Sequence, residues 1–104
     1  MEKLNREVVN IEEYAKVGKN PPTEDAIYRF RVGKIFAESD ERFISGGDIL
    51  RKVGLEPSQQ RLYQKVQGGQ RIPVEKDEQV DLSAPGLERF ETIPLDPTEG
   101  GVKC

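Results

Sequence analysis

The sequence predicts an α+β fold in which one central helix covers a small mixed sheet of four to five strands. Three observations lead to this prediction. Between Tyr28 and Val32, apolar residues alternate with arginines, which is the two-residue period of a half-buried strand. The segment that begins at Ser45 carries helix signals at both ends. Further short apolar segments follow, separated by the glycines and prolines that are typical of turns.

Composition limits the classes of function. The 104 residues suffice for one domain, and with 35% apolar and 34% charged residues its core must be small. The net charge of −3 provides no general attraction to nucleic-acid phosphates or anionic membranes. Neither a membrane-spanning apolar run nor a signal peptide at Met1–Asn5 is recognisable. We therefore expect a soluble cytoplasmic protein that binds neither nucleic acid nor membranes.

The chain has few of the side chains on which catalysis commonly depends. Histidine is absent, which removes the commonest general base and the commonest metal ligand. The single cysteine, Cys104, permits neither an intrachain disulfide nor a cysteine metal site. No motif brings Asp, Glu, Lys or Tyr into a recognisable catalytic arrangement. We expect no enzymatic activity, no metal and no bound cofactor.

The paired prolines Pro21-Pro22 predict a boundary, because they interrupt regular structure. Residues 1–24 are expected to form an N-terminal extension that is either flexible or a short helix. The residues on the apolar face of that helix would be Leu4, Val8, Ile11 and Ala15. Such a strip would dock on a partner or on another copy. Residues 25–95 would form the folded domain, and residues 96–104 a flexible tail.

The folded domain is expected to begin with a hairpin and a helix. Gly33-Lys34 reads as the tight turn between the strand at Tyr28–Val32 and a returning strand at Ile35–Glu38. Ser45 is a good N-cap for the helix, and Gly54 is well placed to end it in the left-handed conformation. The apolar face of the helix would be Ile49, Leu50 and Val53, with Leu55 folded back onto the last turn.

Three more strands are expected after the helix. They are Leu62–Val66, a short strand at Val80–Leu82, and a final strand at Phe90–Leu95. Between them, the segment around Pro73 reads as a loop, and Pro85–Arg89 reads as a turn or a single helical turn.

The stretch from Ile27 to Ile93 resembles the bacterial multiubiquitin-type domain, a ubiquitin-like group. The blocks that carry the resemblance are Tyr28-Arg29-Phe30-Arg31-Val32, Ser45-Gly46-Gly47-Asp48-Ile49-Leu50, Leu62-Tyr63-Gln64, and Val80-Asp81-Leu82 with Pro85-Gly86-Leu87-Glu88-Arg89-Phe90. The last block is the most specific, because its glycine and charged residues hold set positions between two strands. The resemblance implies a β-grasp fold, with the first and last strands side by side in the centre. This chain has a single copy of the block, whereas some members carry tandem copies.

The resemblance also implies a function. Members are similar to protein modifiers encoded beside an activating enzyme, a conjugating enzyme and a processing peptidase, in systems suspected of antiphage defence. The activating enzyme uses ATP; the modifier itself holds no cofactor. Self-association or chain formation would be possible, and the candidate acceptor lysines are Lys34, Lys52, Lys65 and Lys76.

Gly100 and Gly101 are the candidate conjugation and processing site. A modifier's C-terminal carboxylate must thread a narrow channel in extended form, and glycine has no Cβ to clash there. A flexible spacer at Pro97–Glu99 would let the carboxylate reach the channel. Val102, Lys103 and Cys104 follow the pair, so they would form a tripeptide that a peptidase removes. Alternatively, Cys104 is an exposed reactive thiol.

Four residues are candidates for partner binding: Leu62, Tyr63, Glu88 and Arg89. In ubiquitin, the place that Leu62 and Tyr63 would occupy forms an apolar recognition patch. One of these two must face the core, because neighbouring residues of a strand alternate faces. Two other functions stay open. In the first, the chain is a β-grasp interaction module that is never conjugated. In the second, it is a sulfur carrier whose terminal glycine becomes a thiocarboxylate.

Overall fold

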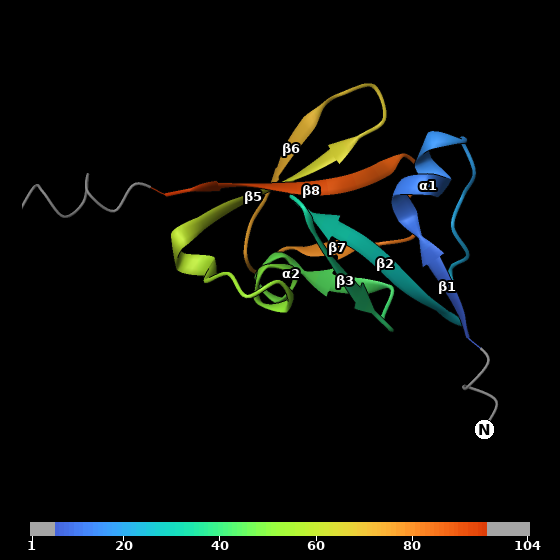
Figure 1. Cartoon of the computed structure of the whole chain (residues 1–104), viewed down its shortest axis with the longest axis horizontal. Coiled ribbons are helices and arrows are strands. Elements are labelled where there is room, and N and C mark those ends of the chain that lie inside the picture. The colour runs from blue at the N-terminus through green and yellow to red at the C-terminus, as the bar shows by residue number, and fades with distance from the viewer. Residues whose placement is uncertain (1–5, 96–104) are drawn as a thin grey trace, which may run out of the picture.

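The structure of the chain, a computed structural model, describes residues 6–95 (Figure 1). The helical elements are α1 (Ile11–Lys16), α2 (Gly46–Lys52) and the 3-10 turn η2 (Pro57–Gln59). The strands are β1 (Glu7–Asn10), β2 (Ala26–Val32), β3 (Ile35–Ser39), β4 (Phe43–Ser45), β5 (Gln60–Val66), β6 (Arg71–Val74), β7 (Gln79–Asp81) and β8 (Leu87–Pro94).

Six of the strands form one mixed sheet, and β4 and β7 form a separate antiparallel pair. In the main sheet β8 lies between β2 and β5, and β6 lies beyond β5. β2 and β8 are parallel and meet at Val32 and Phe90, where the Gly33 N–H donates to the Phe90 carbonyl at 2.9 Å. The first strand of the hairpin and the last strand are therefore neighbours in the centre, which confirms the β-grasp arrangement.

The predicted hairpin is confirmed in register. β2 and β3 pair antiparallel from Tyr28–Ser39 to Val32–Ile35, with Gly33-Lys34 as the two-residue turn. Gly33 has a φ of 60°, which a residue with a Cβ adopts only at a cost. The alternation of Tyr28, Phe30 and Val32 places these three side chains in the core, with at most 3% of each exposed.

Helix α2 begins and ends at the predicted residues. The Ser45 side chain accepts from the Asp48 N–H at 3.1 Å, which satisfies one of the free donors of the first turn. At the other end Gly54 has a φ of 80°, and the Gly54 and Leu55 N–H groups donate to the Arg51 and Leu50 carbonyls. This pair of bonds is the Schellman motif, which folds Leu55 back onto the core.

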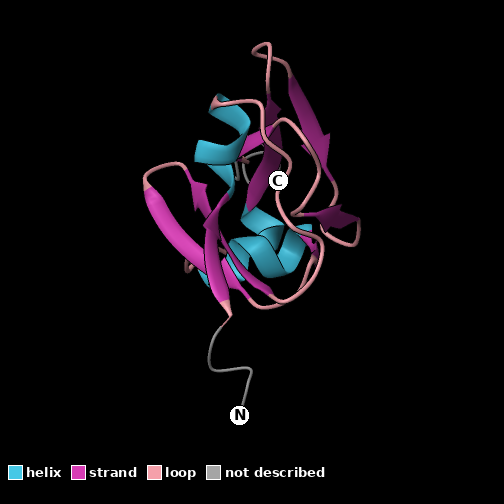
Figure 2. Cartoon of the chain, turned by 90° about the vertical axis from the view of Figure 1, so that its right-hand side faces the viewer, coloured by secondary structure: helices cyan, strands magenta, loops and turns pink. Residues whose placement is uncertain are grey.

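One core joins the sheet and α2. Phe30 and Phe90 pack edge to face, with ring centroids 5.7 Å apart, and Ile49 and Leu50 of α2 lie against them in the same cluster. In Figure 2, α2 is the lower of the two helices, and strands lie on both sides of it. The remaining buried side chains of the cluster are Val9, Ile11, Ala26, Tyr28, Val32, Ile44, Leu62, Val74, Val80, Leu82 and Leu87.

The described part of the N-terminal segment belongs to this fold, contrary to the prediction of an extension. β1 pairs in parallel with β2, from Glu7–Ala26 to Asn10–Arg29, along the same edge of β2 that meets β8 only at Val32. Val9 and Ile11 are buried, whereas Val8 lies in β1 and is 51% exposed, so Val8 does not share a helical face with Ile11 and Ala15. Leu4, the remaining member of the predicted face, lies outside the described residues. The helix starts only at Ile11, because the Asn10 side chain caps it.

The predicted boundary at the paired prolines is likewise absent from the structure. Pro21 is buried, and the Tyr28 hydroxyl donates to the Pro22 carbonyl at 2.5 Å. This bond satisfies a hydroxyl whose ring is only 1% exposed. The prolines end regular structure, as predicted, but the chain around them stays attached to the sheet.

Two strands form where the sequence predicted none. Phe43–Ser45 pairs with Gln79–Asp81, and Arg71–Val74 pairs with β5. β6 tolerates Pro73 because it is an outer strand, where a missing N–H removes no essential bond. β8 begins at Leu87, so part of the predicted turn at Pro85–Arg89 is strand. The main sheet therefore has more strands than the four to five expected.

Candidate functional site

The two faces of β5 decide which of the predicted binding residues is accessible. Leu62 points into the core, where it is 2% exposed and lies beside Val74 of β6. Tyr63 therefore points to the opposite side of the sheet, where it is partly exposed. We call this side of β5, β8 and β6 the open face. Of the predicted pair, only Tyr63 can contact a partner there.

Strand register defines the open face. Tyr63 stands between Glu91 of β8 and Pro73 of β6, and Lys65 stands between Arg89 and Arg71. The open face consists of Arg61, Tyr63, Lys65, Arg71, Pro73, Arg89, Glu91 and Ile93. Arginines and Glu91 surround the aromatic ring, with the Arg71 guanidinium carbon 5.9 Å from its centroid.

The open face differs from the apolar patch that the resemblance to ubiquitin suggested. Its one large exposed aliphatic side chain is Ile93, which is 44% exposed and lies opposite Arg61. The Glu91 carboxylate pairs with Arg89 at 3.1 Å and with Arg71 at 3.5 Å. Three arginines and Lys65 on this face stand against a single acidic group, that of Glu91.

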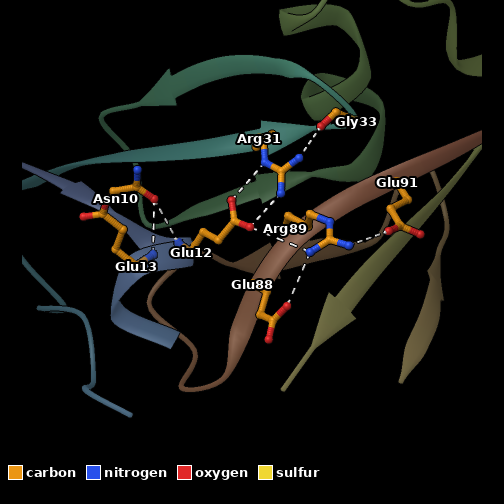
Figure 3. Close-up of polar contacts among 8 residues, drawn as sticks. All are labelled: Asn10, Glu12, Glu13, Arg31, Gly33, Glu88, Arg89 and Glu91. Atoms are coloured by element: carbon orange, nitrogen blue, oxygen red, sulfur yellow. Dashed lines mark hydrogen bonds and ion pairs between the residues drawn. The ribbon is translucent and has the colours of Figure 1, made fainter. Parts of the chain in front are cut away.

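Arg89 lies at the centre of a charge cluster (Figure 3). Its guanidinium reaches Glu91 at 3.1 Å, Glu88 at 3.5 Å and Glu12 at 3.7 Å. Lys65 pairs with Arg89 and Val66 with Leu87, so Glu88 is the extra residue of an irregularity in β8. The structure thus brings the predicted residues Glu88 and Arg89 together, within a strand rather than a turn.

Glu12 anchors α1 to this cluster, and sequence reasoning missed it. Its two carboxylate oxygens accept from Arg31 Nε at 2.9 Å and from Arg31 Nη2 at 2.6 Å (Figure 3). The Arg31 hydrogen bonds hold the pKa of the Glu12 carboxyl below its usual value, although burial opposes them. The sequence signal for this pair is one residue of each charge, Arg31 in β2 and Glu12 in the N-terminal segment, which face each other across the sheet surface.

β8 leads from the core to the edge of the described structure. Phe90 is fully buried, whereas Ile93 and Leu95 are 44% and 40% exposed. The Leu95 N–H donates to the Gln59 carbonyl at 2.9 Å, close to the end of the described chain. Gly100, Gly101, Val102, Lys103 and Cys104, which the sequence predicted as the processing site and removable tripeptide, lie outside the described residues.

The candidate acceptor lysines are spread over the surface. Lys34, Lys52 and Lys76 are exposed, and Lys65 is partly exposed on the open face. Within residues 6–95, no group of three or more acidic, cysteine or histidine side chains could hold a metal ion. None of the helices described by the structure has the length and apolar character to cross a membrane.

Comparison with known proteins assigns the family. The model of the multiubiquitin family matches residues 28–94, which run from the first central strand to the end of β8. The chain has no significant match among curated proteins or among solved structures. The matched segment covers more than half of the sequence and includes β2, α2, β5 and β8, the elements that define the fold. The chain therefore belongs to the multiubiquitin family of ubiquitin-related domains.

Proposed function

We propose that this chain is the precursor of a ubiquitin-like protein modifier, which is cleaved after Gly101 and joined to other molecules through the Gly101 carboxylate. The observation that carries the proposal is the position of the glycine pair. Gly100-Gly101 follows β8, the central strand of a ubiquitin-related domain, at a distance of a few residues. The other two glycine pairs have structural roles, at the start of α2 and in the turn between β5 and β6.

The chemistry requires four successive steps at one carboxyl group. A peptidase first hydrolyses the bond after Gly101 and releases Val102–Cys104. A Gly101 carboxylate oxygen then attacks the α-phosphorus of ATP on an activating enzyme, and pyrophosphate leaves. An enzyme nucleophile next displaces AMP, and a target amine or hydroxyl finally displaces that nucleophile. The modifier needs no acid or base of its own for these steps.

The open face would be the docking surface for the activating and conjugating enzymes. Tyr63 and Ile93 offer an apolar contact, and Arg61, Lys65 and Arg71 can pair with carboxylates of a partner. Because β8 contributes Ile93 to this face and ends at Pro94, a partner held here lies close to the start of the tail in the sequence. The proposed setting is the bacterial cytoplasm, in antiphage defence.

Mass spectrometry of the full chain tests the proposal. The chain is expressed with the peptidase, activating enzyme and conjugating enzyme that the proposal requires. We expect a product that has lost Val102, Lys103 and Cys104, and adducts whose peptides carry the Gly101 carbonyl on a new bond. A variant that stops at Gly101 is expected to form the same adducts without the peptidase.

A variant without Gly100-Gly101 provides the matched control, because it leaves residues 6–95 unchanged. It is expected to fold normally and to form no adduct. Full conjugation by this variant, or an uncut C-terminus in the presence of all three enzymes, contradicts the proposal.

The partly exposed Tyr63 supports a second candidate, a β-grasp interaction module that is never conjugated. In that case the tail is dispensable, and a change at Tyr63 abolishes binding of the partner. The same tail deletion separates the two functions: activity that survives without Gly100-Gly101 but fails in Tyr63→Ala identifies the module.

A further inference from the structure

The outer edge of β3 is an unpaired strand edge within the described structure. β3 pairs with β2 along one side, and no strand of residues 6–95 pairs with its other side. Its first two side chains, Ile35 and Phe36, are 50% and 45% exposed. Unpaired N–H and C=O groups on such an edge can pair with another strand.

The turn geometry shows which backbone groups of β3 are available. Val32 and Ile35 are the first and fourth residues of the two-residue turn, where a hairpin exchanges its backbone hydrogen bonds. Paired residues alternate along an antiparallel ladder between bonded and non-bonded positions. The backbone groups of Ala37 therefore point toward β2, and those of Phe36 and Glu38 point outward. β3 can bond a further strand without losing its pairing with β2.

The side chains along this edge form a self-complementary pattern. Phe36 and Glu38 of β3 lie at two-residue spacing and hence on one side of the hairpin, Lys34 is the turn residue that precedes β3, and all three are exposed. Arg29 of β2 lies on the same side, with its guanidinium carbon 4.4 Å from the centroid of the Phe36 ring. Lys34 precedes Phe36 and carries a positive charge, and Glu38 follows it with a negative charge that also pairs with Arg29 of β2 at 3.9 Å. Antiparallel alignment of two copies on Phe36 places each Lys34 beside the Glu38 of the other copy.

We propose that the chain forms a twofold-symmetric dimer in which the β3 edges of two copies pair antiparallel, with Phe36 on the axis. A second copy fits this edge because the same three residues supply both halves of each contact, as an isologous interface requires. The two sheets would join into one continuous sheet. β8 lies on the other side of β2, so the dimer leaves the open face and the start of the tail accessible. The proposal does not depend on the conjugation chemistry.

The contact is small, so the dimer should be a weak one. Interfaces of this size belong to transient complexes, and we expect association between about 10 μM and about 1 mM. Sedimentation equilibrium of the full chain over this range, with a reducing agent to keep Cys104 as a thiol, measures it. A chain that stays monomeric throughout the range overturns the proposal.

Charge exchange tests the register. Lys34→Glu places two like-charged pairs across the axis, and we expect the dissociation constant to rise about fivefold or more at low salt. Adding Glu38→Lys to that variant restores opposite charges, and we expect the constant to return to within about twofold of the original. A double variant that associates no better than Lys34→Glu overturns the proposed alignment.

Amide hydrogen exchange locates the contact without any substitution. With rising concentration, the Phe36 and Glu38 amides should gain protection, whereas the Ala37 amide, which faces β2, should be protected throughout. Phe36→Lys should abolish association, and Val8→Lys, at an equally exposed position on β1, should leave it unchanged. Association that survives Phe36→Lys but is lost in Ile93→Lys would assign the contact to the open face and overturn the proposal.

Discussion

Replacing Glu12 with glutamine should loosen the N-terminal segment from the sheet. The Glu12 carboxylate accepts two hydrogen bonds from Arg31 and lies 3.7 Å from Arg89, and its side chain is only 9% exposed. In Glu12→Gln the charge is lost, and only the amide oxygen remains to accept from Arg31. The substitution keeps the size of the side chain and the Asn10 cap, so it changes only the charge and the hydrogen bonds of this side chain.

The expected cost follows from the burial of the partners. A hydrogen bond to a charged group contributes about 1.5–3 kcal/mol, and breaking a fully buried ion pair costs about 3–5 kcal/mol. Arg31 and Arg89 keep 26% and 23% of their side chains exposed, so water compensates part of the loss. We therefore expect Glu12→Gln to lower the free energy of unfolding by about 1.5–2.5 kcal/mol.

Urea denaturation measures this loss, and Glu13→Gln is the matched control. Glu13 is the next residue of the same helix and is exposed, so its substitution should change stability by less than about 0.5 kcal/mol. Amide exchange of β1 and α1 should accelerate in Glu12→Gln before that of β5 and β8. Equal stability of the two variants would refute the conclusion that Glu12 holds the N-terminal segment in place.

Three further predictions concern sterics, pH and the open face. Gly46→Ala places a Cβ 2.5 Å from the Glu75 carbonyl oxygen, so it should lower the free energy of unfolding, measured with urea, by about 1–3 kcal/mol. Gly47→Ala, whose Cβ would lie 3.2 Å from its nearest neighbour, should lower it less. Hydrogen bonds from Arg42 and Ser83 lower the pKa of Asp81 to about 2. The ionised Asp81 therefore stabilises the fold by about 1–2 kcal/mol after allowance for solvent screening, and this contribution is complete above pH 3.8 and is lost as the pH falls toward 2. An acid titration in which Asp81→Asn keeps the wild-type dependence of unfolding free energy on pH contradicts this. Tyr63→Ala should impair partner binding at near-normal stability, whereas Leu62→Ala should lower the free energy of unfolding by about 2–4 kcal/mol. A calorimetric binding titration and thermal unfolding separate the two effects. Equal destabilisation by the two substitutions would argue against a role of Tyr63 on the open face.

Local patterns predicted much of the architecture. The alternation around Phe30, the turn at Gly33 and both ends of α2 were confirmed, because each depends on interactions between residues close in the chain. The resemblance supplied the neighbouring positions of the first and last strands, and the family match and the parallel contact at Val32–Phe90 agree with it. Conjugation at Gly100-Gly101 stays a prediction.

The errors share one physical cause. Glu7–Asn10 has too few residues to predict a strand, and it forms one because β2 offers a free edge beside β8. Arg71–Val74 pairs with β5 despite Pro73 for a similar reason. In both segments, hydrogen bonds to a distant strand outweigh weak local preferences. No window of the sequence contains that information.

The sequence alone determined the helix and hairpin signals, the absence of histidine, and the presence of three glycine pairs. The tertiary structure decided which residues surround each of these features. It turned Leu62 inward and Tyr63 outward, and it placed Glu12 against Arg31, 19 residues away in the chain. It also explained Gly46, where the Glu75 carbonyl leaves no room for a Cβ. Burial and ion pairing depend on which distant segments meet, and only the folded chain brings them together.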